Sequence, residues 1–227
     1  MSDYGLLLKN SDEETQIDST YKNYSLHSNV TGTVNYNETD VNTTDTKKVP
    51  IVAYKPSTSN FCCHIGFVKS GSTFTHAKFL GGVNELSIPL RVYVEGQVNS
   101  LPTYGLIVWN SSGEVVFHSN DTPMNIVGIY SNSLAWNAGS GYIDVTVDDA
   151  TNNYFILVPT YPQYIDYVLD GFFDDFYFYT RGLKKINSTT IRVGQFVYYY
   201  LHMPGGGVAP PSDTDNWIDA YTLLEIH

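Results

Sequence analysis

Apolar residues along this chain recur at every second position in short runs, and turn-forming residues interrupt these runs at intervals of roughly 8–12 residues. No segment keeps a helical spacing of apolar residues over a dozen positions, so any helix is expected to be short. Short strands separated by frequent turns are typical of antiparallel sandwiches rather than of folds that alternate strands with helices. The pattern therefore predicts an all-β protein built from antiparallel β-sandwich units.

One phrase of the sequence occurs twice. Residues 4–19 read YGLLLKNSDEETQIDS, and residues 104–119 read YGLIVWNSSGEVVFHS. Tyr, Gly, Leu, Asn, Ser, Glu and the final Ser coincide without a gap, and most other positions exchange residues of similar character. Self-similarity of this density indicates a duplicated structural unit.

Each copy of the phrase is expected to form a β-hairpin whose Tyr-bearing face points inward. That face carries Tyr4, Leu6 and Leu8 in the first copy and Tyr104, Leu106 and Val108 in the second. The second copy has Gly113 at the turn position that favours a left-handed residue, whereas the first copy has Glu13, which predicts a looser or different turn. The opposite face ends in Lys9 or Trp109 and is expected to be half-exposed.

Further elements repeat in the same order after each phrase. Short apolar runs that end at proline, 49–56 (VPIVAYKP) and 154–159 (YFILVP), are expected to be one pair of equivalent strands. The runs 86–96 (LSIPLRVYVEG) and 190–201 (TIRVGQFVYYYL) are expected to be the next pair. The polar stretch 25–48 is interpreted as either an exposed hairpin or a mobile loop.

These repeats predict two tandem β-sandwich units, residues 1–101 and 102–227. Alternatively, the two halves interleave into one sandwich about a pseudo-twofold axis, and the sequence leaves both arrangements open. The second unit contains the Tyr- and Phe-rich strands and a Gly/Pro-rich loop at 204–211. A closing strand is expected at 216–226, where Trp217 either completes the core or docks onto a neighbouring subunit.

Composition narrows the range of partners. Charged residues make up 15% of the chain, and the net charge is −11. Phosphate binding needs a basic face, so nucleic acid is not an expected partner, and an anionic membrane surface is disfavoured for the same reason. No apolar run approaches the length of a membrane span, so no membrane insertion is expected. The first residues lack the pattern of a secretory signal, which predicts that the chain folds in the cytoplasm.

The two cysteines, Cys62 and Cys63, are neighbours in the sequence. In a strand they point to opposite faces, so they do not readily share a metal ion even with His64 next to them. We interpret them as two buried reduced thiols rather than as a metal or redox site. No cofactor is expected.

The duplicated phrase, written Y-G-L-φ-φ-x-N-S-x-G-x-φ-φ-F-x-S, resembles small virion proteins of tailed bacteriophages that belong to the tail tip and tail appendages. The resemblance implies a non-enzymatic structural protein of the virion, located in the tail tip, baseplate or a tail appendage. It also implies other tail proteins and further copies of the chain as partners. The first copy departs from the pattern at Glu13, and Lys9 stands where the second copy has Trp109.

The acidic aromatic stretch 166–179 (DYVLDGFFDDFYFY) is the strongest candidate for chemistry. Carboxylates of this kind act as acid and base in glycoside cleavage or bind Ca²⁺, and the four here are Asp166, Asp170, Asp174 and Asp175. The D-x-D-x-D-G spacing of calcium loops is absent, and Gly171 after Asp170 favours a plain turn. The sequence therefore predicts no catalytic, cofactor-binding or metal-binding residue.

Aromatic residues are too dense in the second half for all of them to face a core, because alternation places half of a strand outside. Exposed aromatic side chains indicate a contact surface for a protein partner or for sugar rings. The interface candidates are Trp109, Phe172, Phe173, Phe176, Tyr177, Phe178, Tyr179, Tyr198, Tyr199, Tyr200 and Trp217. A protein partner is favoured, and the alternative function is a carbohydrate-binding or host-receptor-binding module on the phage tail.

Overall fold

The computed structural model describes residues 7–9, 15–18, 24–82, 85–96, 104–135, 141–158, 163–169, 173–204 and 218–227. Every regular element in these ranges is a β-strand, and all pairs of the named strands are antiparallel. The predicted all-β antiparallel sandwich is confirmed. Within the same ranges there is no helix long and apolar enough to span a lipid bilayer.

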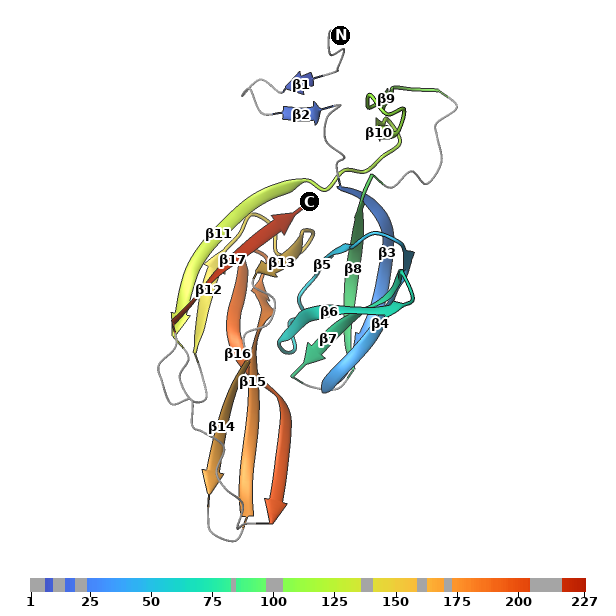
Figure 1. The fold of residues 1–227 in the computed structure, drawn as a ribbon. Helices are drawn as coiled ribbons and strands as arrows, with labels where there is room; N and C mark the ends of the chain where they lie inside the picture. Colours follow the sequence, from blue (N-terminus) through green and yellow to red (C-terminus); the bar gives the residue numbers. More distant parts are fainter. Residues whose placement is uncertain are drawn as a thin grey trace.

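Two large sheets form the layers of the sandwich (Figure 1). The first sheet has the order β11 (Ile126–Ala135), β17 (Ile218–Ile226), β13 (Tyr154–Val158), β5 (Ile51–Tyr54), β8 (Leu86–Glu95) and β3 (Tyr24–Val34). The second has the order β12 (Tyr142–Thr146), β16 (Thr190–Pro204), β15 (Phe173–Asn187), β6 (Cys62–Ser70), β7 (Thr73–Gly81) and β4 (Asn37–Thr46), with β14 (Gln163–Leu169) beside β15. Two small hairpins stand apart: β1 (Leu7–Lys9) with β2 (Thr15–Asp18), and β9 (Ile107–Trp109) with β10 (Val115–His118).

The strand order of the first half is repeated in the second. The order β3-β8-β5 corresponds to β11-β17-β13, and β4-β7-β6 corresponds to β12-β16-β15. The two halves meet edge to edge where β5 pairs with β13 and β6 pairs with β15. Each half keeps its own small two-layer unit, and both sheets continue across the junction.

The register of the strands carries the repeat further than the duplicated phrase. Leu8 pairs with Ile17, and Val108 pairs with Phe117, so the two hairpins share one register at an offset of 100 residues. The same offset relates a bulge in β3, after Leu26, to a bulge in β11, after Ile126. The correspondence between the halves therefore extends without a gap from the hairpin into the first long strand.

The predicted inward face of the second hairpin is only partly correct. Val108 is 6% exposed, but Tyr104 is 90% exposed and Leu106 is 44% exposed. The strand begins at Ile107, so both exposed residues precede it, and the hairpin buries only a small cluster around Val108 and Val116. The expected left-handed glycine is present, with a φ of 76° at Gly113. Glu13, Tyr4 and Leu6 lie outside the described residues.

The polar stretch 25–48 is neither a hairpin nor a loop. It forms β3 and β4, which belong to opposite sheets and pair with β8 and β7. Both are edge strands, and each has one face on the core and the other in water, which explains their polar alternation. The hydroxyl of Ser28 donates to the carbonyl oxygen of Thr43 at 3.0 Å and links the two layers at this edge.

The second pair of predicted equivalent strands is wrong. The strand that corresponds to β8 is β17, whereas β16 corresponds to β7. An alternating apolar pattern specifies which face of a strand is buried but not which strand lies beside it. The strand expected at 216–226 is confirmed as β17, which lies between β11 and β13, and Trp217 lies outside the described residues.

Cys62 and Cys63 are free and buried, as the sequence predicts. Cys62 belongs to the main core, whereas Cys63 packs in a separate cluster with Leu80 and Phe196 on the other side of the sheet. Burial raises the pKa of the Cys62 thiol to about 12, and burial raises the pKa of Cys63 as well. Both thiols are therefore protonated and inert in the native state.

We expect neither thiol to react with Ellman's reagent while the protein is folded, because a buried thiol reacts only after local or global opening. In denaturant both thiols should titrate, and absorbance of the released thiolate measures both stages. Rapid reaction of the native protein would contradict the buried environment of this pair.

Candidate interaction surfaces

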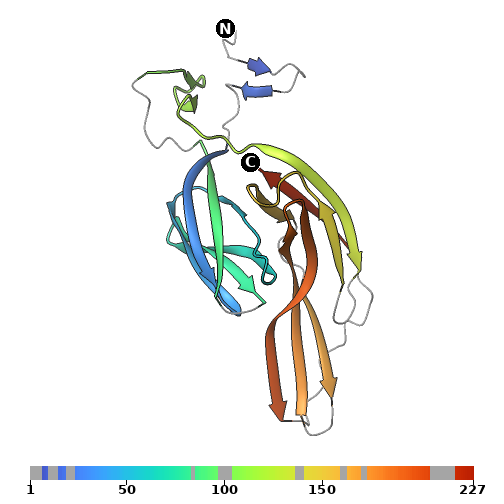
Figure 2. The ribbon, with the colours of Figure 1, turned by 180° about the vertical axis from the view of Figure 1, so that it is seen from behind.

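The strands β15 and β16 are 15 residues long, whereas the corresponding strands β6 and β7 of the first unit are 9 residues long. Their additional length and β14 form a three-stranded sheet that projects beyond the two-layer body (Figures 1 and 2). We call this element the arm and define it as residues 163–169, 173–180 and 197–204. No strand of the other large sheet accompanies it among the described residues. The described part of the first unit contains no counterpart of the arm.

Most of the interface candidates lie on the arm. They are Phe173, Phe176, Tyr177, Phe178 and Tyr179 on β15, and Tyr198, Tyr199 and Tyr200 on β16. The register pairs Tyr177 with Tyr200 and Phe178 with Tyr199. The structure thus brings positions from two separate stretches of sequence into one sheet. Phe172 lies outside the described residues, as Trp217 does.

Trp109 is separated from the other candidates. It lies on β9, in the small hairpin at the opposite end of the molecule from the arm (Figure 1), and its side chain is 52% exposed. Its exposure agrees with a contact surface of its own, and its role in an interface stays a prediction.

The described aspartates of the acidic stretch, Asp166, Asp174 and Asp175, do not share one register position. Asp166 pairs with Tyr177, whereas Asp174 pairs with Leu169, which is three residues, or about 10 Å, further along β14. Asp170 lies outside the described residues. Among the side chains that the structure describes, no group of three His, Cys, Asp or Glu residues is placed to hold a metal ion.

A cleft of about 510 Å³ opens at one end of the first unit, between its two sheets. Its lining residues are Tyr24, Lys47, Lys48, Val49, Lys69, Ser72, Phe74 and Glu95. The Lys48 ammonium donates to the carbonyl oxygen of Glu95 at 3.0 Å, and the Lys69 ammonium lies 4.4 Å from the centre of the Phe74 ring. Lys47 makes no hydrogen bond or ion pair with any described residue.

Sequence reasoning missed this cleft. The only local signal is the doublet Lys47-Lys48, in the connection between β4 and β5. Lys69 comes from the end of β6, and the fold alone brings it to the same place.

The corresponding end of the second unit is closed. There the connection between β12 and β13 packs on the turn between β15 and β16 through two backbone hydrogen bonds, from Val147 to Thr189 at 2.9 Å and from Ala150 to Ser188 at 2.8 Å. The Lys185 ammonium also donates to the Thr151 hydroxyl at 2.9 Å.

A buried carboxylate holds this closed end together. Glu225, near the end of β17, is fully buried and accepts hydrogen bonds from Tyr130, Asn153 and the backbone N–H groups of Asp148 and Asp149, at 2.7–3.1 Å. Burial by itself would raise the pKa of Glu225, but the hydrogen bonds together lower it below 4.5. The ionised form is therefore the native one.

A second, smaller hollow of about 400 Å³ lies between the edge strands β11 and β12. Ile129 and Tyr142 stand at these edges with 66% and 52% of their surface exposed. Within the lining, Asp144 forms a two-point ion pair with Arg192 at 2.6 and 2.8 Å, and Arg192 lies over the ring of Tyr142. This hydrogen-bonded Arg192 lowers the pKa of Asp144.

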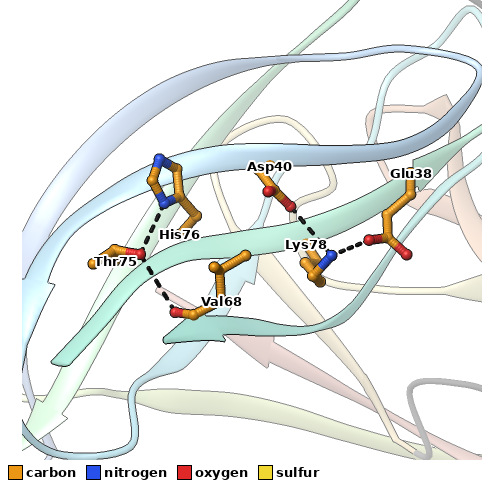
Figure 3. Close-up of polar contacts among 6 residues, drawn as sticks. All are labelled: Glu38, Asp40, Val68, Thr75, His76 and Lys78. Atoms are coloured by element: carbon orange, nitrogen blue, oxygen red, sulfur yellow. Dashed lines mark hydrogen bonds and ion pairs between the residues drawn. The ribbon is translucent and has the colours of Figure 1, made fainter. Parts of the chain in front are cut away.

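An ion pair also lies on the outer face of the first unit (Figure 3). Lys78 of β7 lies between Glu38, to which it donates a hydrogen bond, and Asp40 at 3.5 Å, both from β4. Asp40 and Lys78 are register partners, as Asp144 and Arg192 are in the second unit. The two pairs occupy corresponding strands, so we interpret them as a shared structural feature. Exposed pairs of this kind contribute about 0–1 kcal/mol to stability.

Beside this pair, His76 and Thr75 of β7 form a short polar chain on the same strand (Figure 3). The His76 ring nitrogen Nδ1 lies 2.9 Å from the Thr75 hydroxyl, which donates to the carbonyl oxygen of Val68 at 3.5 Å. The hydrogen bond from Thr75 to Val68 connects β7 to β6.

Comparison of this chain with protein families, with curated proteins and with solved structures gives no match. The class of protein that the fold defines is an antiparallel β-sandwich of two corresponding units, with an arm on the second.

Proposed function

We propose that this chain is a non-enzymatic structural protein of a tailed-bacteriophage virion, in the tail tip, the baseplate or a tail appendage. In this proposal the arm is the element through which each copy contacts neighbouring subunits. The resemblance of the duplicated phrase to tail components supports the first part, and the arm is the observation that supports the second.

Both faces of the arm carry aromatic positions. Alternation along a strand gives each face every second position, and the sequence FDDFYFY at 173–179 supplies aromatic residues at both sets of positions. The tyrosines at 198–200 on the neighbouring strand do the same. A sheet that projects from the body with aromatic positions on both sides is typical of an element that a partner covers.

The first unit provides a design for removing the arm. There, residues 55–61 join β5 to β6 and residues 82–85 join β7 to β8. Replacing 159–180 by the sequence of 55–61, and 197–217 by that of 82–85, gives a second unit with the connections of the first. We expect this variant to fold and to lose both self-association and incorporation into particles, measured by sedimentation and by mass spectrometry of purified virions.

The control is Ser111→Ala/Ser112→Ala, which changes two exposed turn residues outside the arm and leaves Trp109 in place. We expect it to assemble as the unaltered chain does. Assembly of the armless variant at the level of the unaltered chain would refute the role of the arm, and absence of the chain from purified particles would refute the virion assignment.

A second candidate function is binding of a host-surface carbohydrate or receptor. The observation that favours it is the open cleft at the end of the first unit, where the second unit is closed.

A further inference from the structure

The cleft of the first unit lies where the second unit is sealed by its own chain. In the second unit, the connection 147–153 is bonded to the turn 188–189 and pinned by Glu225. In the first unit, the corresponding connection 47–50 stands apart from the turn 71–72, and a volume of about 510 Å³ remains between them. Among the described residues, two units with the same strand order thus differ at this end in whether the connection is hydrogen-bonded to the turn.

The charge of the cleft is opposite to that of the chain. Three lysines and one glutamate line it, whereas the whole chain has a net charge of −11 from only 12 Lys and Arg residues. Lys48 is held by Glu95, which leaves Lys47 and Lys69 without a carboxylate partner among the described residues. Cations that converge on a concave surface concentrate their field there, so the cleft attracts anions despite the negative chain.

The size and lining of the cleft indicate a ligand that is larger than a simple anion and has apolar surface as well as charge. A volume of about 510 Å³ lies within the usual range of small-molecule sites, roughly 300–1,000 Å³. Val49, 60% exposed, and the half-buried ring of Tyr24 offer apolar surface beside the ammonium groups. Ser72 adds a hydroxyl that donates and accepts. Apolar surface beside cations and a hydroxyl matches a sugar ring that bears an acidic group.

We infer that the cleft lined by Lys47, Lys69 and Tyr24 binds an acidic saccharide, with the two lysines contacting its carboxylate or phosphate groups. This inference concerns the first unit alone and does not depend on assembly through the arm, so each can fail without the other. If it holds, the chain contacts an anionic glycan through the cleft of its first unit.

Binding is tested by calorimetry on the full chain with trigalacturonate, with neutral maltotriose, with inorganic phosphate and with triglutamate. We expect trigalacturonate to bind more tightly than the other three and its affinity to fall as salt is raised. The variant K47Q/K69Q should weaken trigalacturonate binding about tenfold, because it removes two charge-assisted contacts. The matched control K184Q/K185Q removes the same charge from β15 and should change the affinity less than about twofold.

The alternatives give distinct results. Affinity for maltotriose equal to that for trigalacturonate would show that the cleft does not recognise the charge of the saccharide. Affinity for inorganic phosphate equal to that for trigalacturonate would show a site for a simple anion. Binding of triglutamate as tight as that of trigalacturonate would indicate an acidic protein partner. Each of these outcomes overturns the inference, as does a loss of affinity in K184Q/K185Q equal to that in K47Q/K69Q. Circular dichroism of each variant verifies that the fold is retained.

Discussion

Glu225→Ala is expected to lower the free energy of unfolding by about 3–5 kcal/mol, because several buried donors lose their acceptor at once. The Tyr130 hydroxyl, the Asn153 amide and two backbone N–H groups all donate to this carboxylate. Guanidinium denaturation followed by circular dichroism measures the change.

The matched control is Glu95→Ala, at the end of the strand that corresponds to β17 in the first unit. The side chain of Glu95 is 49% exposed and lies 3.9 Å from the ammonium of Lys48. Removing it should change the free energy of unfolding by no more than about 1 kcal/mol. Equal losses in the two variants would contradict the structural difference between the ends of the units.

The same network predicts a pH dependence. The pKa of Glu225 is lower in the folded protein than its ordinary value of 4.5. A carboxylate with a depressed folded pKa contributes stability that is fully present above the unfolded pKa and is lost as pH falls through the folded pKa. The stability difference between the unaltered chain and Glu225→Gln should therefore be largest above pH 4.5 and shrink below it. A difference that grows as the solution is acidified would contradict the direction of this shift.

Local patterns in the sequence predicted the elements that depend on local chemistry. Prolines mark the ends of the runs that became β5 and β13, and Gly113 marks the turn of the second hairpin. Alternation also identified β17 as a strand. In each instance the deciding interaction lies within a few residues, so the sequence contains it directly.

The features that escaped prediction depend on pairs of residues far apart in the chain. The consecutive strands β3 and β4 belong to different sheets because β3 pairs with β8 and β4 pairs with β7. The alternation of apolar residues gives no information on these partners. The cleft depends on Lys47 and Lys69, which separate strands bring together. Glu225 could be recognised as a buried acid only once its donors, such as Asn153, were placed around it.

The junction between the units is the site of the second large effect. Phe155 of β13 is fully buried and pairs across the junction with Tyr54 of β5. The Tyr54 hydroxyl donates to the carbonyl oxygen of Cys62 at 3.0 Å, and its ring packs edge-on against Phe79, with centres 5.4 Å apart. Residues of both halves and of both sheets therefore belong to one core.

Phe155→Ala is expected to lower the free energy of unfolding by about 3–5 kcal/mol, because it leaves a cavity in this shared core. Both units should still unfold in one transition, so tryptophan fluorescence and circular dichroism should give the same midpoint in guanidinium. Tyr54→Phe removes only the hydroxyl that donates to the carbonyl oxygen of Cys62 and should lower the free energy of unfolding by about 1–2 kcal/mol. The control Ile129→Ala changes a residue that is 66% exposed and should alter the free energy of unfolding by less than about 0.5 kcal/mol. Two separate transitions, with only one shifted by Phe155→Ala, would show that the units are independent domains, since a core shared across the junction couples their unfolding.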